Sequence, residues 1–129
     1  MSDLAKRAVA CKHWRWMPGM SSLHPRMGPA RVLRVTQQGV WVVKEESLAS
    51  GFRVDEDGCV PDLTDPATLG CLLALVRKAW DDPQVHAAPL CGMKNDHVGW
   101  RVWLGRDLTL YFDGDTEAEA LVAALEAAP

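Results

Sequence analysis

The chain lacks most of the features that mark an enzyme or a membrane protein. It contains no Walker loop and no G-x-G-x-x-G, G-x-S-x-G or H-E-x-x-H motif, so the signatures of nucleotide-binding enzymes, α/β-hydrolases and zinc peptidases are missing. Its longest apolar stretch, residues 69–76, is interrupted by Gly70 and is far shorter than the roughly 20 residues of a membrane-spanning helix. We therefore expect a non-enzymatic protein that binds no cofactor and no membrane.

Paired cysteines and an export signal are also missing. The four cysteines, at positions 11, 59, 71 and 91, are far apart and include no C-x-x-C pair. The N-terminus has neither a long apolar segment nor a cleavage site for a signal peptidase. Both observations favour free thiols in a reducing compartment, and we expect the cytoplasm.

The bulk composition is that of an ordinary globular protein. A chain of 129 residues with 48% apolar and 24% charged residues fits one domain, residues 1–129, and excludes a wholly disordered protein. The net charge of -3 argues against a dedicated nucleic-acid binder, since such domains are usually basic. The charge is uneven, however, because residues 6–34 hold seven Lys and Arg and no carboxylate.

Helical patterns occur at three places. Residues 3–12 are rich in good helix formers. A second helix is predicted to begin at Pro66, because Asp65 can cap it and proline is favoured at the first helical position. The pattern continues to residue 80. Thr116 and Glu119 form a capping box at the start of an Ala-rich C-terminal helix. The predicted apolar face of the middle helix consists of Leu69, Leu72, Leu73, Val76 and Trp80.

Strand patterns lie between these helices. Residues 31–35 and 40–43 predict one hairpin, and residues 100–104 and 108–112 predict another. Residues 84–88 predict a further strand. The connecting stretches 20–30 and 45–63 are interpreted as irregular loops.

Together, these elements predict an α+β fold in the order α-ββ-α-βββ-α. The expected architecture is a small antiparallel sheet of about four or five strands, arranged in hairpins, with three helices packed on it.

Two sets of residues are candidates for function. Four side chains could together bind zinc: Cys11, His13, Cys91 and His97. Their spacing, however, is not that of the short loops of structural zinc sites. The six tryptophans are unusual beside one Tyr and two Phe. Trp14 and Trp16 flank Arg15 in a basic segment, where such residues can pack the core, anchor a protein interface or stack on nucleic acid.

Four stretches resemble small proteins of bacteriophages and prophages. They are KHWRWMPGM (residues 12–20), PDLTDPATLGCLLALV (61–76), GWRV (99–102) and TEAEALVAAL (116–125). The layout of the second half is similar to the phage α/β/α sandwich domains of unknown function. The resemblance implies a phage origin and a fold class, and it transfers no catalytic residue.

The leading hypothesis is a non-enzymatic phage accessory protein that binds a host protein or protein complex. The specific form considered is inhibition of a bacterial defence ribonucleoprotein, in the manner of an anti-CRISPR protein. Acidic clusters can present carboxylates where phosphates would lie in a nucleic-acid channel of the target. The predicted contact residues are Trp14, Arg15, Trp16, Glu45, Glu46, Asp55, Glu56 and Asp57. The alternatives are weak nucleic-acid binding through the basic N-terminal region and a small zinc-binding protein.

Overall fold

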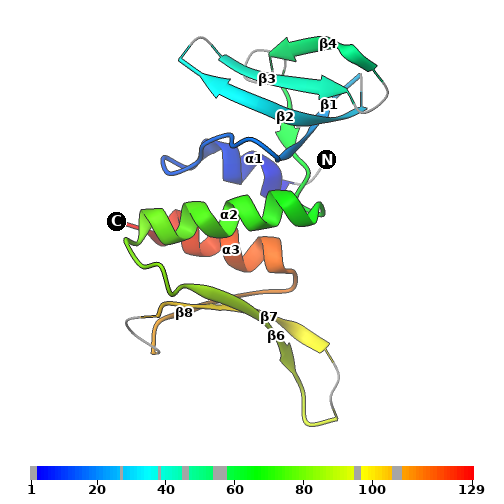
Figure 1. Ribbon diagram of the computed structural model, residues 1–129. Coiled ribbons are helices and arrows are strands. Elements are labelled where there is room, and N and C mark those ends of the chain that lie inside the picture. The colour runs from blue at the N-terminus through cyan, green and yellow to red at the C-terminus, as the bar shows by residue number, and fades with distance from the viewer. Residues whose placement is uncertain are drawn as a thin grey trace. The chain divides into compact units, whose positions relative to one another are not determined.

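The computed structural model describes residues 3–26, 28–37, 39–44, 47–53, 58–94, 97–105 and 109–129. Within these residues the chain forms three α-helices and eight β-strands, and the strands make two antiparallel sheets (Figure 1). The predicted α+β class is confirmed, as is the order in which helices and groups of strands alternate. The strands are divided between two sheets, and the first group holds five strands where the sequence predicted two.

The contacts within the chain divide it into two compact units. Unit 1 comprises Met1–Val9 and Arg15–Cys71, and unit 2 comprises Ala10–Trp14 and Leu72–Pro129. That residues 1–129 behave as a single domain stays a prediction.

Unit 1 contains a five-stranded sheet in the order β4-β3-β2-β1-β5. Its strands are β1 (Ser21–His24), β2 (Gly28–Thr36), β3 (Gly39–Lys44), β4 (Ser47–Arg53) and β5 (Val60–Pro61). The predicted first hairpin is confirmed, since β2 pairs with β3 in antiparallel fashion and Thr36 lies opposite Gly39.

Both stretches that were interpreted as loops contain strands, so that part of the prediction is wrong. Residues 20–30 hold β1 and the start of β2, and residues 45–63 hold β4 and β5. Strand β1 was not predicted because its buried positions are occupied by polar residues. Ser22 is fully buried and donates its hydroxyl to the Ala30 carbonyl at 3.0 Å, so the strand shows no apolar alternation. In β5 the proline lies on an edge strand of the sheet, where a missing N–H is tolerated.

Helix α1 (Asp3–Ala10) buries Ala5 and Ala8. It ends two residues before the predicted boundary at residue 12. The backbone then turns, with the Trp14 N–H donating to the Cys11 carbonyl at 3.0 Å.

Helix α2 (Pro66–Ala79) begins where the sequence predicted and ends one residue before the predicted boundary at residue 80. The Asp65 carboxylate accepts the Thr68 N–H at 2.9 Å, which is the bond of an N-cap residue, and Pro66 follows it. At the other end Asp81 has a left-handed backbone (φ 49°), and the Asp82 N–H donates to the Arg77 carbonyl at 2.9 Å. This is the hydrogen-bond pattern of a helix closed by a left-handed residue.

Unit 2 contains a three-stranded sheet in the order β6-β7-β8. Its strands are β6 (His86–Cys91), β7 (His97–Trp103) and β8 (Tyr111–Gly114). The predicted second hairpin is confirmed by the antiparallel pairing of β7 with β8, and the single strand predicted before it is β6.

Helix α3 (Glu117–Ala127) packs against this sheet. The Thr116 hydroxyl accepts the Glu119 N–H at 3.2 Å, as a capping box requires. The Glu119 carboxylate reaches back to the Asp115 N–H at 2.8 Å, one residue further than the usual capping-box partner. The core of the unit consists of fully buried aliphatic side chains: Leu72, Val76, Val85, Val102, Leu121, Val122 and Leu125. Burying each such side chain contributes about 1.5–3 kcal/mol.

Candidate interaction surface

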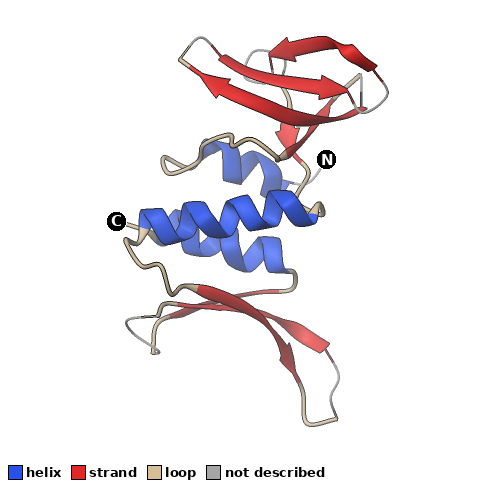
Figure 2. Ribbon diagram, viewed as in Figure 1, coloured by secondary structure: helices blue, strands red, loops and turns tan. Residues whose placement is uncertain are grey.

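The β6-β7-β8 sheet has one face covered by a helix and one face open. Successive side chains along a strand point to opposite faces. Val102 is fully buried on the face that α3 covers, and on the same face Phe112 lies 5.9 Å from the Trp80 ring, centroid to centroid. In the described part of unit 2, no helix covers the opposite face (Figure 2). We call this opposite face the outer face.

The register of the strands aligns the outer-face residues in two rows. In one row His86 lies opposite Trp103, and Trp103 lies opposite Tyr111. In the neighbouring row Arg101 lies between Ala88 and Asp113. Side chains that face each other across antiparallel strands are in contact distance, so the sheet itself determines which groups meet.

The aromatic rings and the guanidinium of the outer face form a continuous stack. The His86 ring stacks on the Trp103 ring with centroids 5.2 Å apart and an interplanar angle of 22°. The guanidinium carbon of Arg101 lies 3.8 Å from the centroid of the Tyr111 ring and 5.8 Å from that of Trp103. Both distances are within the range of cation–π attraction.

Arg101 also forms a two-pronged ion pair with Asp113. Its Nε donates to Asp113 Oδ1 at 2.6 Å and its Nη2 donates to Oδ2 at 2.9 Å. These hydrogen bonds hold the pKa of Asp113 below its ordinary value and raise the pKa of Arg101. Both groups therefore stay charged at neutral pH, and the geometry of a fork-to-fork pair holds the Arg101 guanidinium in place.

The outer face has the chemical character of a binding surface. Its guanidinium and carboxylate are bonded to each other, so neither is free to act as an acid or base on a substrate. Trp, Tyr and Arg are the residue types that dominate binding energy in protein interfaces. Tyr111 remains 45% exposed and His86 is exposed, so a partner can reach the surface.

The outer-face residues are not among the contact residues predicted from the sequence. A signal was present, because alternation along residues 100–104 places Arg101 and Trp103 on the face opposite to Val102 and Leu104. The second strand repeats this pattern, with Tyr111 and Asp113 separated by one residue. What the sequence did not show is that no helix of the unit covers that face.

The predicted N-terminal contact residues differ in exposure and in the unit to which they belong. Arg15 is exposed, whereas Trp14 and Trp16 are half-buried, in a segment without helix or strand. Trp14 belongs to unit 2, and Arg15 and Trp16 belong to unit 1. The predicted acidic contact residues, Glu45, Glu46, Asp55, Glu56 and Asp57, lie outside the described residues.

The four predicted zinc ligands are not brought together. The Cys11 thiol contacts the Leu125 carbonyl at 3.7 Å, and His13 Nε2 lies 3.3 Å from the Ala128 carbonyl. Cys91 and His97 are opposite each other on β6 and β7, and both are exposed. Among the described residues, no three His, Cys, Asp or Glu side chains are placed to share a metal ion.

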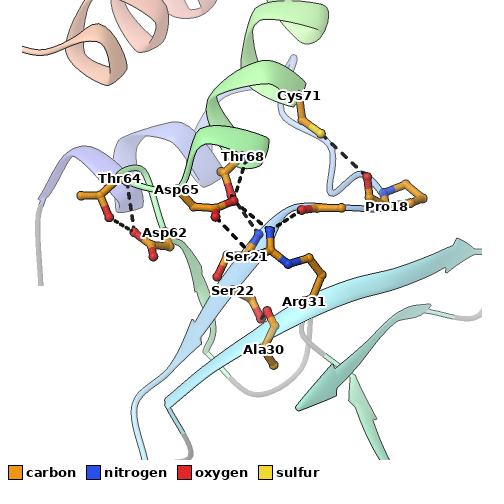
Figure 3. Close-up of polar contacts among 11 residues, drawn as sticks. Pro18, Ser21, Ser22, Ala30, Arg31, Asp62, Thr64, Asp65, Thr68 and Cys71 are labelled. Carbon is orange, nitrogen blue, oxygen red and sulfur yellow. Dashed lines mark hydrogen bonds and ion pairs between the residues drawn. The ribbon is translucent and has the colours of Figure 1, made fainter. Parts of the chain in front are cut away.

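A second polar cluster lies in unit 1, around the start of α2 (Figure 3). Arg31 donates to both carboxylate oxygens of Asp65, at 2.9 and 3.3 Å, and to the Gly19 carbonyl at 2.8 Å. Thr68 donates both its N–H and its hydroxyl to Asp65, each at 2.9 Å, and its hydroxyl accepts the Ser21 N–H at 2.8 Å.

The Asp65 carboxylate is held by four hydrogen bonds within unit 1. Its Oδ2 accepts three of them, from Arg31 Nη1 and from the N–H and hydroxyl of Thr68, and its Oδ1 accepts one from Arg31 Nη2. The Arg31 bond lowers the pKa of Asp65 more than partial burial raises it. The cluster therefore joins strands β1 and β2 to the N-terminus of α2, and we assign it a structural role.

Comparison of the chain with models of protein families, with curated proteins and with solved structures finds no match. None of the described helices has the length and apolar character required to cross a membrane.

Proposed function

We propose that the chain is a non-enzymatic protein that acts by binding a second protein through the outer face of its β6-β7-β8 sheet. The observation that carries this proposal is the stack of His86, Trp103, Arg101 and Tyr111 on the face that no described helix of the unit covers. The resemblance to small phage proteins makes a host complex in the bacterial cytoplasm the first partner to test, with defence ribonucleoproteins the first class.

Preorganisation supports a role in binding. Ordering a long side chain on association costs roughly 0.5–1.5 kcal/mol. The Arg101 guanidinium is already held by two bonds to Asp113 and by the Tyr111 ring, and the Trp103 ring is already stacked by His86. A partner that docks on these groups therefore loses less affinity to ordering than it would on free side chains.

Charge favours a protein partner over nucleic acid. Aromatic rings on an open sheet can stack on bases, but affinity for nucleic acid comes largely from cations that neutralise phosphates. Arg101, the one Lys or Arg in the two outer-face rows, is paired with Asp113, and the whole chain carries a net charge of -3. Nucleic-acid binding is accordingly kept as an alternative outcome of the experiment.

The experiment compares pull-downs from host lysate with four forms of the protein, before and after nuclease treatment. The forms are the natural chain, Tyr111→Ala on the outer face, Arg15→Ala in the N-terminal segment, and Leu33→Ala. Leu33 is a matched control because it is an exposed apolar residue, 62% exposed, on the other sheet.

We expect a nuclease-resistant partner whose recovery falls at least about tenfold with Tyr111→Ala, since interface hot spots contribute about 2 kcal/mol or more. Arg15→Ala and Leu33→Ala should retain the partner. Loss with Arg15→Ala alone would place the site in the N-terminal segment and contradict the proposal. A partner removed by nuclease would favour the nucleic-acid alternative.

A further inference from the structure

The net negative charge of the protein resides in unit 2. Unit 1 contains eight Lys and Arg and eight Asp and Glu, and unit 2 contains six Lys and Arg and nine Asp and Glu. The outer face belongs to unit 2, so its surroundings attract cations and repel anions.

Asp113 is the most accessible charged group in the two rows of the outer face. Its side chain is 47% exposed, against 26% for Arg101. Arg101 occupies two of the roughly four lone-pair sites of the carboxylate. The remaining sites can accept further hydrogen bonds from a donor that approaches from solvent.

The chain itself shows which donor this surface accommodates. Arg101 combines a close contact of its guanidinium carbon with the Tyr111 ring, 3.8 Å from the centroid, and a two-pronged bond to Asp113. A guanidinium is the side-chain group that stacks on an aromatic face and pairs with a carboxylate at the same time. Tyr111 as a whole residue remains 45% exposed with Arg101 in place, so a second cation can approach it from solvent.

We infer that the outer face binds a basic segment of the partner protein, with an arginine of that segment stacked on Tyr111 and paired with Asp113. This inference rests on the proposed function and names the chemistry of the partner. The carboxylate selects a cation, and the ring selects a flat guanidinium over a lysine ammonium. The negative charge of unit 2 strengthens the attraction and makes it sensitive to salt.

The test uses the full chain and a short oligoarginine peptide as the probe. Tyr111 is the single tyrosine of the sequence, so the protein labelled at tyrosine gives one set of ring signals in an NMR spectrum. Calorimetric titrations then compare the peptide affinity of the natural chain with that of Asp113→Asn and of Tyr111→Leu, since the last variant has no tyrosine signal to follow. The matched control is Asp81→Asn, which removes one negative charge from an exposed residue of unit 2 outside the sheet.

We expect the oligoarginine peptide to shift the Tyr111 ring signals of the natural chain. Asp113→Asn and Tyr111→Leu should each weaken peptide binding about three- to tenfold, because exposed ion pairs and cation–π contacts are individually modest. Asp81→Asn should weaken it by less than about twofold, as expected for a screened distant charge. An oligolysine peptide of equal length should bind less tightly.

Three outcomes would overturn the inference. The first is peptide binding without a change in the Tyr111 signals, which would place the peptide elsewhere. The second is an equal effect of Asp81→Asn and Asp113→Asn, which would mean diffuse attraction to an acidic protein. The third is that a single-stranded oligonucleotide shifts the Tyr111 signals and the oligoarginine peptide does not.

The two proposals fail in different ways. If the peptide does not bind but the pull-down partner is still lost with Tyr111→Ala, the outer face binds a protein of other chemistry and only this inference fails. If no partner depends on Tyr111, the proposed function fails whatever the peptide does. Thermal melting of Asp113→Asn and Tyr111→Leu verifies that each variant is folded.

Discussion

At the scale of single residues, Asp65 illustrates how one carboxylate can serve several elements. It caps helix α2 through the Thr68 N–H and holds Arg31 of strand β2 by two hydrogen bonds. An asparagine can also cap a helix, whereas an alanine cannot. Substitution of Asp65 by asparagine and by alanine therefore separates the stability contributed by the helix cap from that contributed by the ion pair.

We expect Asp65→Ala to lower the free energy of unfolding by about 2–3 kcal/mol, because it removes both the cap and the charged hydrogen bonds. Asp65→Asn should lower it by about 1 kcal/mol, since the cap is kept. Urea denaturation of the three proteins measures both values. Equal losses in the two variants would show that the pair with Arg31 contributes nothing.

The same residue predicts a dependence on pH. The pKa of Asp65 is lowered in the folded protein, chiefly by Arg31. The resulting stabilisation is therefore fully present above the unfolded-state pKa of about 3.9 and is lost as the pH falls through the lower native value. The difference in unfolding free energy between the natural chain and Asp65→Asn should be constant near neutral pH and shrink below about pH 4.

The cysteines should differ in their reactivity toward an alkylating reagent. Cys91 is exposed, whereas Cys59 is buried. Burial also raises the pKa of the Cys71 thiol, which lowers its thiolate fraction. We expect iodoacetamide to modify Cys91 first and Cys59 last in the native protein, as followed by mass spectrometry of peptides. Rapid modification of Cys59 would contradict the burial of that side chain.

At the scale of elements, two glycines test how tightly the chain is packed around α2 and α3. A Cβ added at Gly70, in α2, would have no heavy atom within 4 Å. A Cβ added at Gly114, at the end of β8, would lie 2.5 Å from the Ala120 nitrogen and 2.6 Å from the Glu119 Cβ. The absence of a side chain at Gly114 is what permits the strand to approach α3 so closely.

We expect Gly70→Ala to raise the free energy of unfolding by about 0.5–1 kcal/mol, because alanine is the better helix former. Gly114→Ala should lower it by about 1–3 kcal/mol, since the backbone of α3 must shift to admit a methyl group. Thermal melting of both variants measures the two effects, and the opposite sign at either position would contradict the packing described.

At the scale of the whole molecule, helix α2 contributes residues to both units. Its first six residues belong to unit 1 and the rest belong to unit 2. Helix formation is cooperative, so loss of one part of α2 should weaken the other. We expect a single unfolding transition in calorimetry, with equal calorimetric and van't Hoff enthalpies. Two separate transitions would instead show two independent domains and contradict the single domain predicted for residues 1–129.

Local sequence signals were enough to predict all three helices and the two main hairpins. The start of α2 at Asp65 and Pro66, and the start of α3 at Thr116, rest on hydrogen bonds between residues close in the chain. Signals of this kind can be recognised from a short segment of the sequence alone. For the same reason the outward direction of Arg101 and Trp103 followed from alternation along a single strand.

Tertiary structure decided the elements whose partners are distant. In strand β1 the backbone N–H of Ser21 donates to the Thr68 hydroxyl, 47 residues away, and no local pattern records such a bond. The division of the strands into two sheets depends on which pairs form. The row of His86, Trp103 and Tyr111 also depends on strand pairing, because these residues meet only when β6, β7 and β8 are aligned. The sequence by itself determined which side chains alternate along each strand, and long-range pairing decided which of them meet in the rows of the outer face.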